Sequence, residues 1–277
     1  MTLLSSVAAR SWSEILQAPE NIQLALFHQA AASFCRDDVK SGFRAFAADL
    51  LARDLIGMDE YVTILGGTAL FCLEPGPQGR FNDMRTGHDA GKLAAIYSRA
   101  KYGGVDEIQY LARCLVDYLY VELDNPRSQW TTLFQNAKAS GDCVVMMTTG
   151  WRNVPSTANV LYDIVVEAIN LKLAHLGLPT IINVKLPRLA PPCENYASLT
   201  LDEREQVNLV QDHVIPAENF YHWSGVHVIF GDDVLVTGST ADKVLQESLH
   251  NGAKSFRALY PLAIDPRVAL TDATIEE

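Results

Sequence analysis

Cysteine is scarce in this sequence of 277 residues, and it follows no recognisable pattern. There are five cysteines, an odd number, far apart and never spaced as CxxC: Cys35, Cys72, Cys114, Cys143 and Cys193. Disulfide frameworks and structural zinc sites use paired or closely spaced cysteines. The pattern therefore argues against both and predicts reduced thiols, as in a cytoplasmic protein.

Positive charge and long apolar runs are also in short supply. Lysine and arginine number 22 against 33 acidic residues, so the formal net charge is −11 and nucleic acid is not an expected partner. No window reaches the roughly 20 apolar residues of a membrane span, and the start, MTLLSSVAARSWSEILQ, has no signal-peptide core. We therefore expect a cytoplasmic protein that does not enter a membrane.

Several common site motifs are missing as well. The seven histidines show neither HxxxH nor HExxH spacing, which argues against a transition-metal site. The segment LGGTAL at residues 65–70 lacks the GxGxxG fingerprint of dinucleotide-binding proteins, and no GxSxG motif is present. The chemistry must be sought in other patterns.

Apolar spacing divides the chain into two parts. Residues 1–140 contain helical periodicity at 21–34, 41–56 and 105–123, with a Gly- and Pro-rich loop at 74–92. From 141 to 277, short apolar runs alternate with helical segments, which is typical of a parallel sheet with crossover helices. The expected strands are 143–148, 179–186, 226–230 and 255–264, and the expected helices are 154–177, 199–213 and 240–252. These patterns predict an α/β fold with a mainly helical N-terminal portion.

The strongest motif is GDDVLVTGST, residues 231–240, between the predicted strand VHVIF and a predicted helix. A helix N-terminus presents free backbone N–H groups and a positive dipole end, and both favour an anion. Gly238 lets the backbone approach a ligand closely, and the hydroxyl groups of Thr237, Ser239 and Thr240 add hydrogen-bond donors. This arrangement predicts a phosphate-binding loop.

Two adjacent acids, Asp232 and Asp233, follow the same strand. They stand at the carboxyl end of a predicted parallel strand, where open α/β sheets bind ligands. Adjacent carboxylates there suit the two hydroxyls of a ribose or a hydrated divalent metal ion. The alternative is an Asp-rich strand-to-helix turn with a Ser/Thr cap, but the full combination favours a ligand site.

The combined pattern of apolar strand, two acids, apolar triplet and TGST resembles the type I phosphoribosyltransferase family, which binds phosphoribosyl pyrophosphate (PRPP). The resemblance implies that Asp232 and Asp233 contact the ribose hydroxyls and that the loop from Val236 to Thr240 binds the 5-phosphate. Hypoxanthine-guanine members carry an Asp near the purine ring where this chain has Val236. That difference disfavours an acid-assisted oxopurine reaction.

The family also has a pyrophosphate-binding loop after its first core strand, and TTGWRNVPST at 148–157 occupies that position here. The resemblance implies that Thr149, Gly150, Trp151 and Arg152 hold pyrophosphate. Arg152 would supply charge to the leaving group during catalysis. The alternative is that Trp151 packs in the core and Arg152 is a surface charge.

Further family positions lie downstream. Lys185 and Arg188 stand where members often present a basic residue to pyrophosphate, with an exposed basic strand end as the competing interpretation. Residues 189–222 correspond to a flexible loop that closes over PRPP, and its candidate contacts are Tyr196, Ser198 and Arg204. An ordinary solvated loop and helix would explain the same residues.

Residues 96–115, 196–206 and the PRPP motif together are most similar to phosphoribosyltransferase-like proteins associated with bacterial tellurium-resistance and stress-response gene clusters. Those relatives usually carry an Arg or similar residue where this chain has Leu235 and Val236. The helical portion would form a hood over the nucleobase, and its candidate residues are Arg85, His88, Arg99, Lys101 and Tyr102. For each of these, an ordinary solvated surface position is the alternative.

The resemblance implies transfer of the phosphoribosyl group of PRPP to a nitrogenous base or related acceptor, with release of pyrophosphate. The expected cofactor is Mg²⁺, with Asp232 and Asp233 as candidate ligands, and many family members dimerise across the helical face. The alternatives are a nucleotide sensor without turnover, a nucleotide-cleaving hydrolase or phosphorylase, and a transferase with an unusual acceptor. The sequence does not choose the acceptor.

Overall fold

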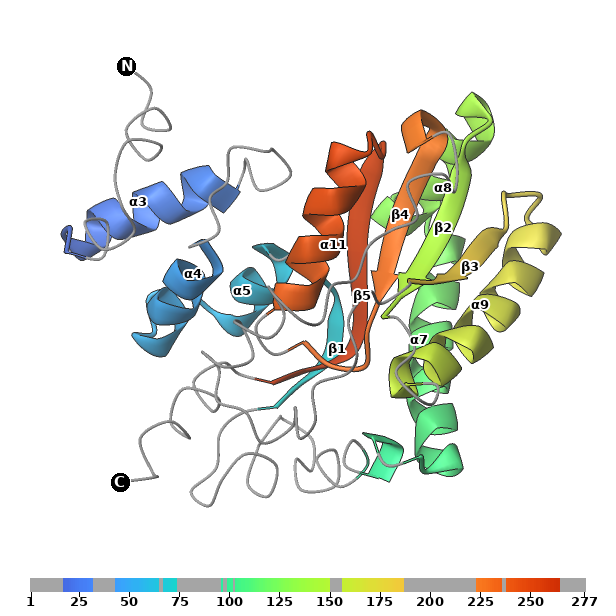
Figure 1. Ribbon diagram of the computed structural model, residues 1–277, viewed down its shortest axis with the longest axis horizontal. Coiled ribbons are helices and arrows are strands. Elements are labelled where there is room, and N and C mark those ends of the chain that lie inside the picture. The colour runs from blue at the N-terminus through green and yellow to red at the C-terminus, as the bar shows by residue number, and fades with distance from the viewer. Residues whose placement is uncertain are drawn as a thin grey trace.

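A computed structural model describes residues 17–31, 43–64, 67–73, 96, 99–101, 103–149, 156–186, 223–235 and 238–264. In chain order, its elements are α3 (Glu20–Ala31), α4 (Phe43–Ala52), α5 (Met58–Ile64), β1 (Ala69–Leu73), α7 (Val105–Asp124), α8 (Gln129–Ser140), β2 (Cys143–Thr148), α9 (Thr157–His175), β3 (Ile181–Lys185), a 3₁₀ turn (Trp223–Gly225), β4 (Val226–Gly231), α11 (Ser239–His250) and β5 (Ser255–Ile264) (Figure 1). The predicted α/β class is confirmed.

The strands form a single five-stranded sheet in the order β1-β5-β4-β2-β3, and every neighbouring pair is parallel. Parallel neighbours need crossover connections, which α9 supplies between β2 and β3 and α11 supplies between β4 and β5. The two predicted β-α-β units are therefore confirmed, while the excursion predicted between them lies outside the described residues.

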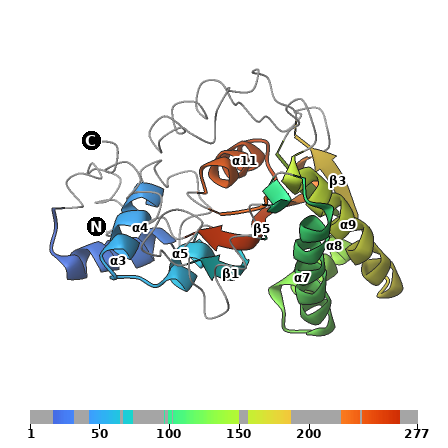
Figure 2. The same cartoon turned by 90° about the horizontal axis from the view of Figure 1, so that it is seen from below.

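The two faces of the sheet are covered by different helices. Alternate side chains of a strand point to opposite faces, so Val145 and Met147 of β2 pack with α3, α4, α5 and α11. Val144 and Met146 of the same strand pack with α7, α8 and α9. Figure 2 shows α11 on one side of the strands and α7–α9 on the other. Both faces are buried, which explains why the strands are nearly continuous apolar runs.

Local signals in the sequence fix where the main crossover helix begins. Ser156 caps α9 by accepting from the backbone N–H of Asn159 at 3.2 Å, and Asn159 Oδ1 accepts from the backbone N–H of Ser156 at 3.0 Å. This reciprocal capping box satisfies two backbone donors that a helix end leaves open.

Strand β1 was not expected, because the part of the chain before residue 141 was predicted to be mostly helical. A short apolar run such as ALFCL cannot be told from a buried helical segment by periodicity alone. β1 pairs with β5, so the N-terminal portion shares its sheet with the strands that follow residue 141. The division at residue 140 stays a prediction.

Two other expectations, the loop at 74–92 and the short helix at 199–213, lie outside the described residues. Among the described helices, none combines the length and apolarity needed to cross a bilayer.

Candidate functional site

The centre of the sheet contains a topological switch point. β2 and β4 are neighbours, yet the chain leaves β2 toward β3 on one side and leaves β4 toward β5 on the other. In such sheets ligands bind in the crevice outside the carboxyl ends of the two diverging strands. Thr148, the last residue of β2, is paired in register with Gly231, the last of β4. The residues that follow both strands therefore start side by side.

The acid pair directly follows β4 at this switch point. The backbone N–H of Asp232 donates to the carbonyl of Leu259 at 3.2 Å, and the backbone N–H of Asp233 donates to Asp232 Oδ1 at 2.9 Å. Asp233 is almost fully buried, and Lys101 Nζ donates to its Oδ2 at 2.7 Å. Lys101, one of the expected hood residues, thus reaches the acid pair from the segment before α7.

Burial and the neighbouring acid change the acidity of Asp232. Burial, and next the charge of Asp233, raise the pKa of Asp232 to about 7, while the charge of Lys101 acts in the opposite direction. Both raising effects disfavour the ionised form of Asp232. Near neutral pH a substantial share of Asp232 is therefore protonated.

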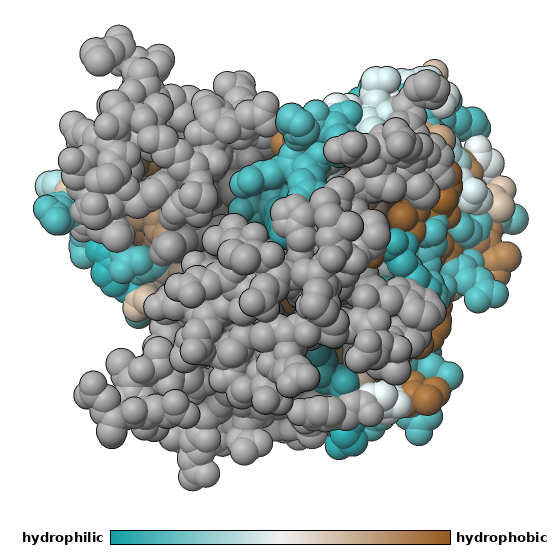
Figure 3. Space-filling model, viewed as in Figure 1, coloured by the Kyte–Doolittle hydropathy of each residue, from teal (hydrophilic) through white to brown (hydrophobic). Residues whose placement is uncertain are grey.

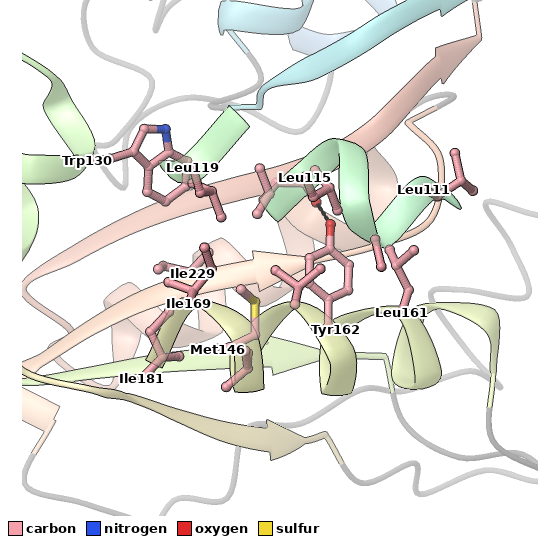
Figure 4. Packing of buried hydrophobic residues seen from close by; sticks show 14 of the residues in the cluster. Leu111, Leu115, Leu119, Trp130, Met146, Leu161, Tyr162, Ile169, Ile181 and Ile229 are labelled. Carbon is pink, nitrogen blue, oxygen red and sulfur yellow. Dashed lines mark hydrogen bonds between the residues drawn. The ribbon is translucent and has the colours of Figure 1, made fainter. Parts of the chain in front are cut away.

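Gly231 is required by a close contact beneath the acids. A Cβ atom at this position would lie 2.7 Å from the ring of Tyr162, closer than real Cβ contacts. Tyr162 points from α9 into the buried cluster between the helices and the sheet (Figure 4). Its hydroxyl donates to the carbonyl of Leu259 and lies 3.1 Å from the carbonyl oxygen of Asp232. Tyr162 therefore supports the backbone that carries Asp232.

The other side of the crevice is anchored by Asn159. Its amide donates to Thr148 Oγ1 at 2.9 Å and to the carbonyl of Thr149 at 2.8 Å. Thr148 and Thr149 are both buried. With the capping box at Ser156, these bonds fix both ends of the candidate pyrophosphate loop. Gly150, Trp151 and Arg152 lie outside the described residues.

The candidate phosphate loop leads into α11. Gly238 is the N-cap of this helix with φ of 74°, a left-handed conformation that favours glycine. Because glycine has no side chain, it leaves the first backbone N–H groups of α11 without a side-chain cap. Val236 and Thr237, and the side chain of Ser239, are not among the described parts, and Thr240 is partly exposed. Figure 3 shows a hydrophilic surface over α11.

Two other candidates have partners of their own. Lys185 Nζ donates to Asp163 Oδ2 of α9 at 2.7 Å, and Arg99 forms an ion pair with Glu107 of α7. Of the remaining expected contacts, these lie outside the described residues: Arg85, His88, Tyr102, Arg188, Tyr196, Ser198 and Arg204.

The supporting roles of Tyr162 and Asn159 were not predicted from the sequence. The spacing of Ser156 and Asn159 was a usable signal, because a capping residue followed three positions later by a hydrogen-bonding side chain marks a helix start. Tyr162 had no such signal, since its role depends on a contact across the sheet.

Within the described residues, no three His, Cys, Asp or Glu side chains gather as a metal-binding group. The acid pair is the candidate for a cation held together with a ligand. No protein-family model matches this chain, and no curated protein matches it in sequence.

Proposed function

We propose that this chain is a Mg²⁺-dependent phosphoribosyltransferase that binds PRPP at the crevice between β2 and β4. One observation carries the proposal. The acid pair of Asp232 and Asp233 lies at the switch point, directly after β4, and α11 begins a few residues later behind Gly238. A ribose-binding group and an anion-binding group are thereby presented at one edge of the sheet.

The acid pair has acceptor atoms to spare for ribose. Asp233 Oδ2 accepts from Lys101, and Asp232 Oδ1 accepts from the backbone N–H of Asp233. Each carboxylate also has a second oxygen, Asp232 Oδ2 and Asp233 Oδ1, and a carboxylate oxygen can accept more than one hydrogen bond. Two neighbouring acceptors suit the 2- and 3-hydroxyls of a ribose.

The start of α11 suits the 5-phosphate of the same ligand. Its first backbone N–H groups and its dipole favour an anion, and the left-handed Gly238 gives the backbone close access. In this arrangement the acids hold the ribose from one side, while the helix start holds the phosphate.

The donor set of the acid pair also fits Mg²⁺. This ion keeps several waters and usually takes one or two carboxylates together with substrate phosphates, so a group of three protein ligands is not required. Asp232 would hold it, because Asp233 already accepts from Lys101. When bound, Mg²⁺ supplies positive charge that neutralises the leaving pyrophosphate.

The chain's own part in the reaction is positioning and charge. Displacement of pyrophosphate by a nitrogen nucleophile passes through a state with positive character at the ribose ring. The buried carboxylate of Asp233 would stabilise that charge and hold the hydroxyls in place. Tyr162 and Asn159 keep the two sides of the crevice in register.

Calorimetry tests the proposal. PRPP is titrated into the protein with and without Mg²⁺, alongside ribose 5-phosphate, AMP, GMP and UMP. We expect saturable binding of PRPP that depends on Mg²⁺. It should be weakened but still measurable in Asp233→Asn, and unchanged in Asp142→Asn, a partly buried acid that follows α8 at the other edge of the sheet. Binding of a nucleotide without PRPP would favour a sensor or a hydrolase. Failure of every phosphoribosyl compound to bind would overturn the proposal.

A further inference from the structure

Two backbone hydrogen bonds close a turn around Lys101. The N–H of Gly103 donates to the carbonyl of Ala100 at 3.1 Å, and the N–H of Gly104 donates to the carbonyl of Arg99 at 2.9 Å. These two bonds form a Schellman motif, and Gly103 adopts the left-handed φ of 87° that the motif requires. Lys101 is therefore a helical residue enclosed by the hydrogen bonds of the turn that leads into α7.

This turn is also tied to α9. Thr157 Oγ1, in the first turn of α9, donates to the carbonyl of Ala100 at 3.1 Å, and this bond is buried. Thr157 is the last residue of the candidate pyrophosphate loop and directly follows Ser156, the cap of α9. The backbone at residue 100 is thus bound to the β2 side of the crevice, while the side chain of Lys101 is bound to the β4 side.

The exposures of the two charged partners differ sharply. The side chain of Lys101 is 49% exposed, whereas that of Asp233 is 3% exposed. The ammonium therefore lies between solvent and the buried acid. The net charge of the chain is −11, so an anionic ligand depends on local positive charge to approach two carboxylates.

We propose that Lys101 is a ligand-binding residue of this crevice: it holds Asp233 in the free protein and pairs with the pyrophosphate group of the ligand when ribose hydroxyls replace it on the carboxylate. The proposal rests on the function proposed above and names a residue that selects ligands by their negative charge. Lysine suits this exchange, because its ammonium is a compact charge on a flexible stem.

The exchange also accounts for the charge of the filled crevice. Without a ligand, the ammonium neutralises one carboxylate of the pair. With a ligand, hydroxyl donors take over that carboxylate, and the ammonium exchanges Asp233 for phosphate oxygens. Charge-assisted hydrogen bonds of this kind are about twice as strong as neutral ones. The more negative charge the phosphate groups of a ligand carry, the more strongly its affinity should therefore depend on Lys101.

Calorimetry on single variants tests this dependence. Lys101→Met should weaken binding of PRPP with Mg²⁺ roughly tenfold to a hundredfold, and binding of ribose 5-phosphate by a clearly smaller factor. Lys101→Arg should recover part of the loss. The matched control is Lys254→Met, since Lys254 is 44% exposed and also pairs with a shielded acid, Asp142, at 2.5 Å. That variant should bind both ligands as the parent does.

A double variant distinguishes direct contact of Lys101 with the ligand from a role in which Lys101 only supports Asp233. If Lys101 touches the ligand, adding Lys101→Met to Asp233→Asn should weaken ribose 5-phosphate or PRPP binding further. Equal losses for both ligands, or no further loss in the double variant, would make Lys101 structural and overturn this inference alone. If the parent protein binds neither ligand, both this inference and the proposed function fail.

Discussion

The sheet has an amino edge, where its strands begin, and a carboxyl edge, where they end, and each edge holds a shielded aspartate beside a lysine. An aspartate pKa is lowered at the amino edge and raised at the carboxyl edge. At the amino edge, Asp142 Oδ2 accepts from Lys254 Nζ at 2.5 Å and lies 3.3 Å from His227 Nε2. The other ring nitrogen of His227 lies 2.8 Å from Ser255 Oγ. The hydrogen bond from Lys254, and next that from His227, lower the pKa of Asp142 despite partial desolvation.

At the carboxyl edge, the acid has a second acid as its neighbour. Burial and the charge of Asp233 raise the pKa of Asp232, and Lys101 offsets only part of this effect. The amino edge is therefore a cluster of paired charges that joins the starts of β2, β4 and β5. At the carboxyl edge, burial and a second acid disfavour the ionised form of Asp232. Perturbed acids of the second kind gather at functional sites.

The largest effect should follow from removing the charge of Asp233. Asp233→Asn is expected to lower pyrophosphate release from PRPP roughly 10²–10³-fold, because the carboxylate holds the ribose and stabilises the charge that develops on it. Steady-state assays of pyrophosphate release measure this, and circular dichroism checks the fold. Asp142→Asn is the control at the opposite edge and should keep its turnover. Near-normal activity of Asp233→Asn would contradict the assignment.

The next largest effect should come from Gly231. Gly231→Ala places a Cβ atom against the buried ring of Tyr162 and should lower the free energy of unfolding by about 3 kcal/mol, the upper end of the range for overpacking. Urea denaturation measures it. Combining the change with Tyr162→Leu should recover part of the loss, whereas simple addition of the two losses would show that the contact is not the cause.

The sequence was sufficient to predict most of the sheet. β2 and β5 have the predicted ends, because each is an apolar run bounded by glycine or polar residues. The places of the acid pair directly after β4 and of Gly238 directly before α11 were also predicted, because the residues of a strand–loop–helix motif are contiguous in the chain. In contrast, β1 is a run too short to distinguish from a helix.

The contacts that complete the site could not be predicted from sequence. Lys101 and Asp233 are 132 positions apart, and their pairing depends on the turn at Gly103 and on the bond from Thr157. Lys101 was named as a hood residue without any indication that it reaches the acids. Tyr162 supports Asp232 through a helix that packs across the sheet, which no local pattern encodes.

A smaller effect, with a sign opposite to that of most core changes, is expected at Asp232. The pKa of its carboxyl is raised to about 7 in the folded protein, so stability is lost as pH rises from about 4 through 7. Asp232→Asn removes this loss and should raise the free energy of unfolding by roughly 2 kcal/mol at pH 8, with little gain near pH 4. Urea denaturation with a chelator present measures it. A variant less stable than the parent at pH 8 would contradict the raised pKa.

The smallest effect, and the mirror image of the last, is expected at Asp142. Its pKa is lowered below the usual value of 3.8, so its ion pair stabilises the fold above that pH and the contribution is lost as pH falls further. Asp142→Asn should therefore be less stable than the parent at pH 7, and the difference should shrink below about pH 4. The same denaturation series measures both edges. If the two aspartate variants shifted stability in the same direction with pH, the contrast between a structural and a functional edge would be lost.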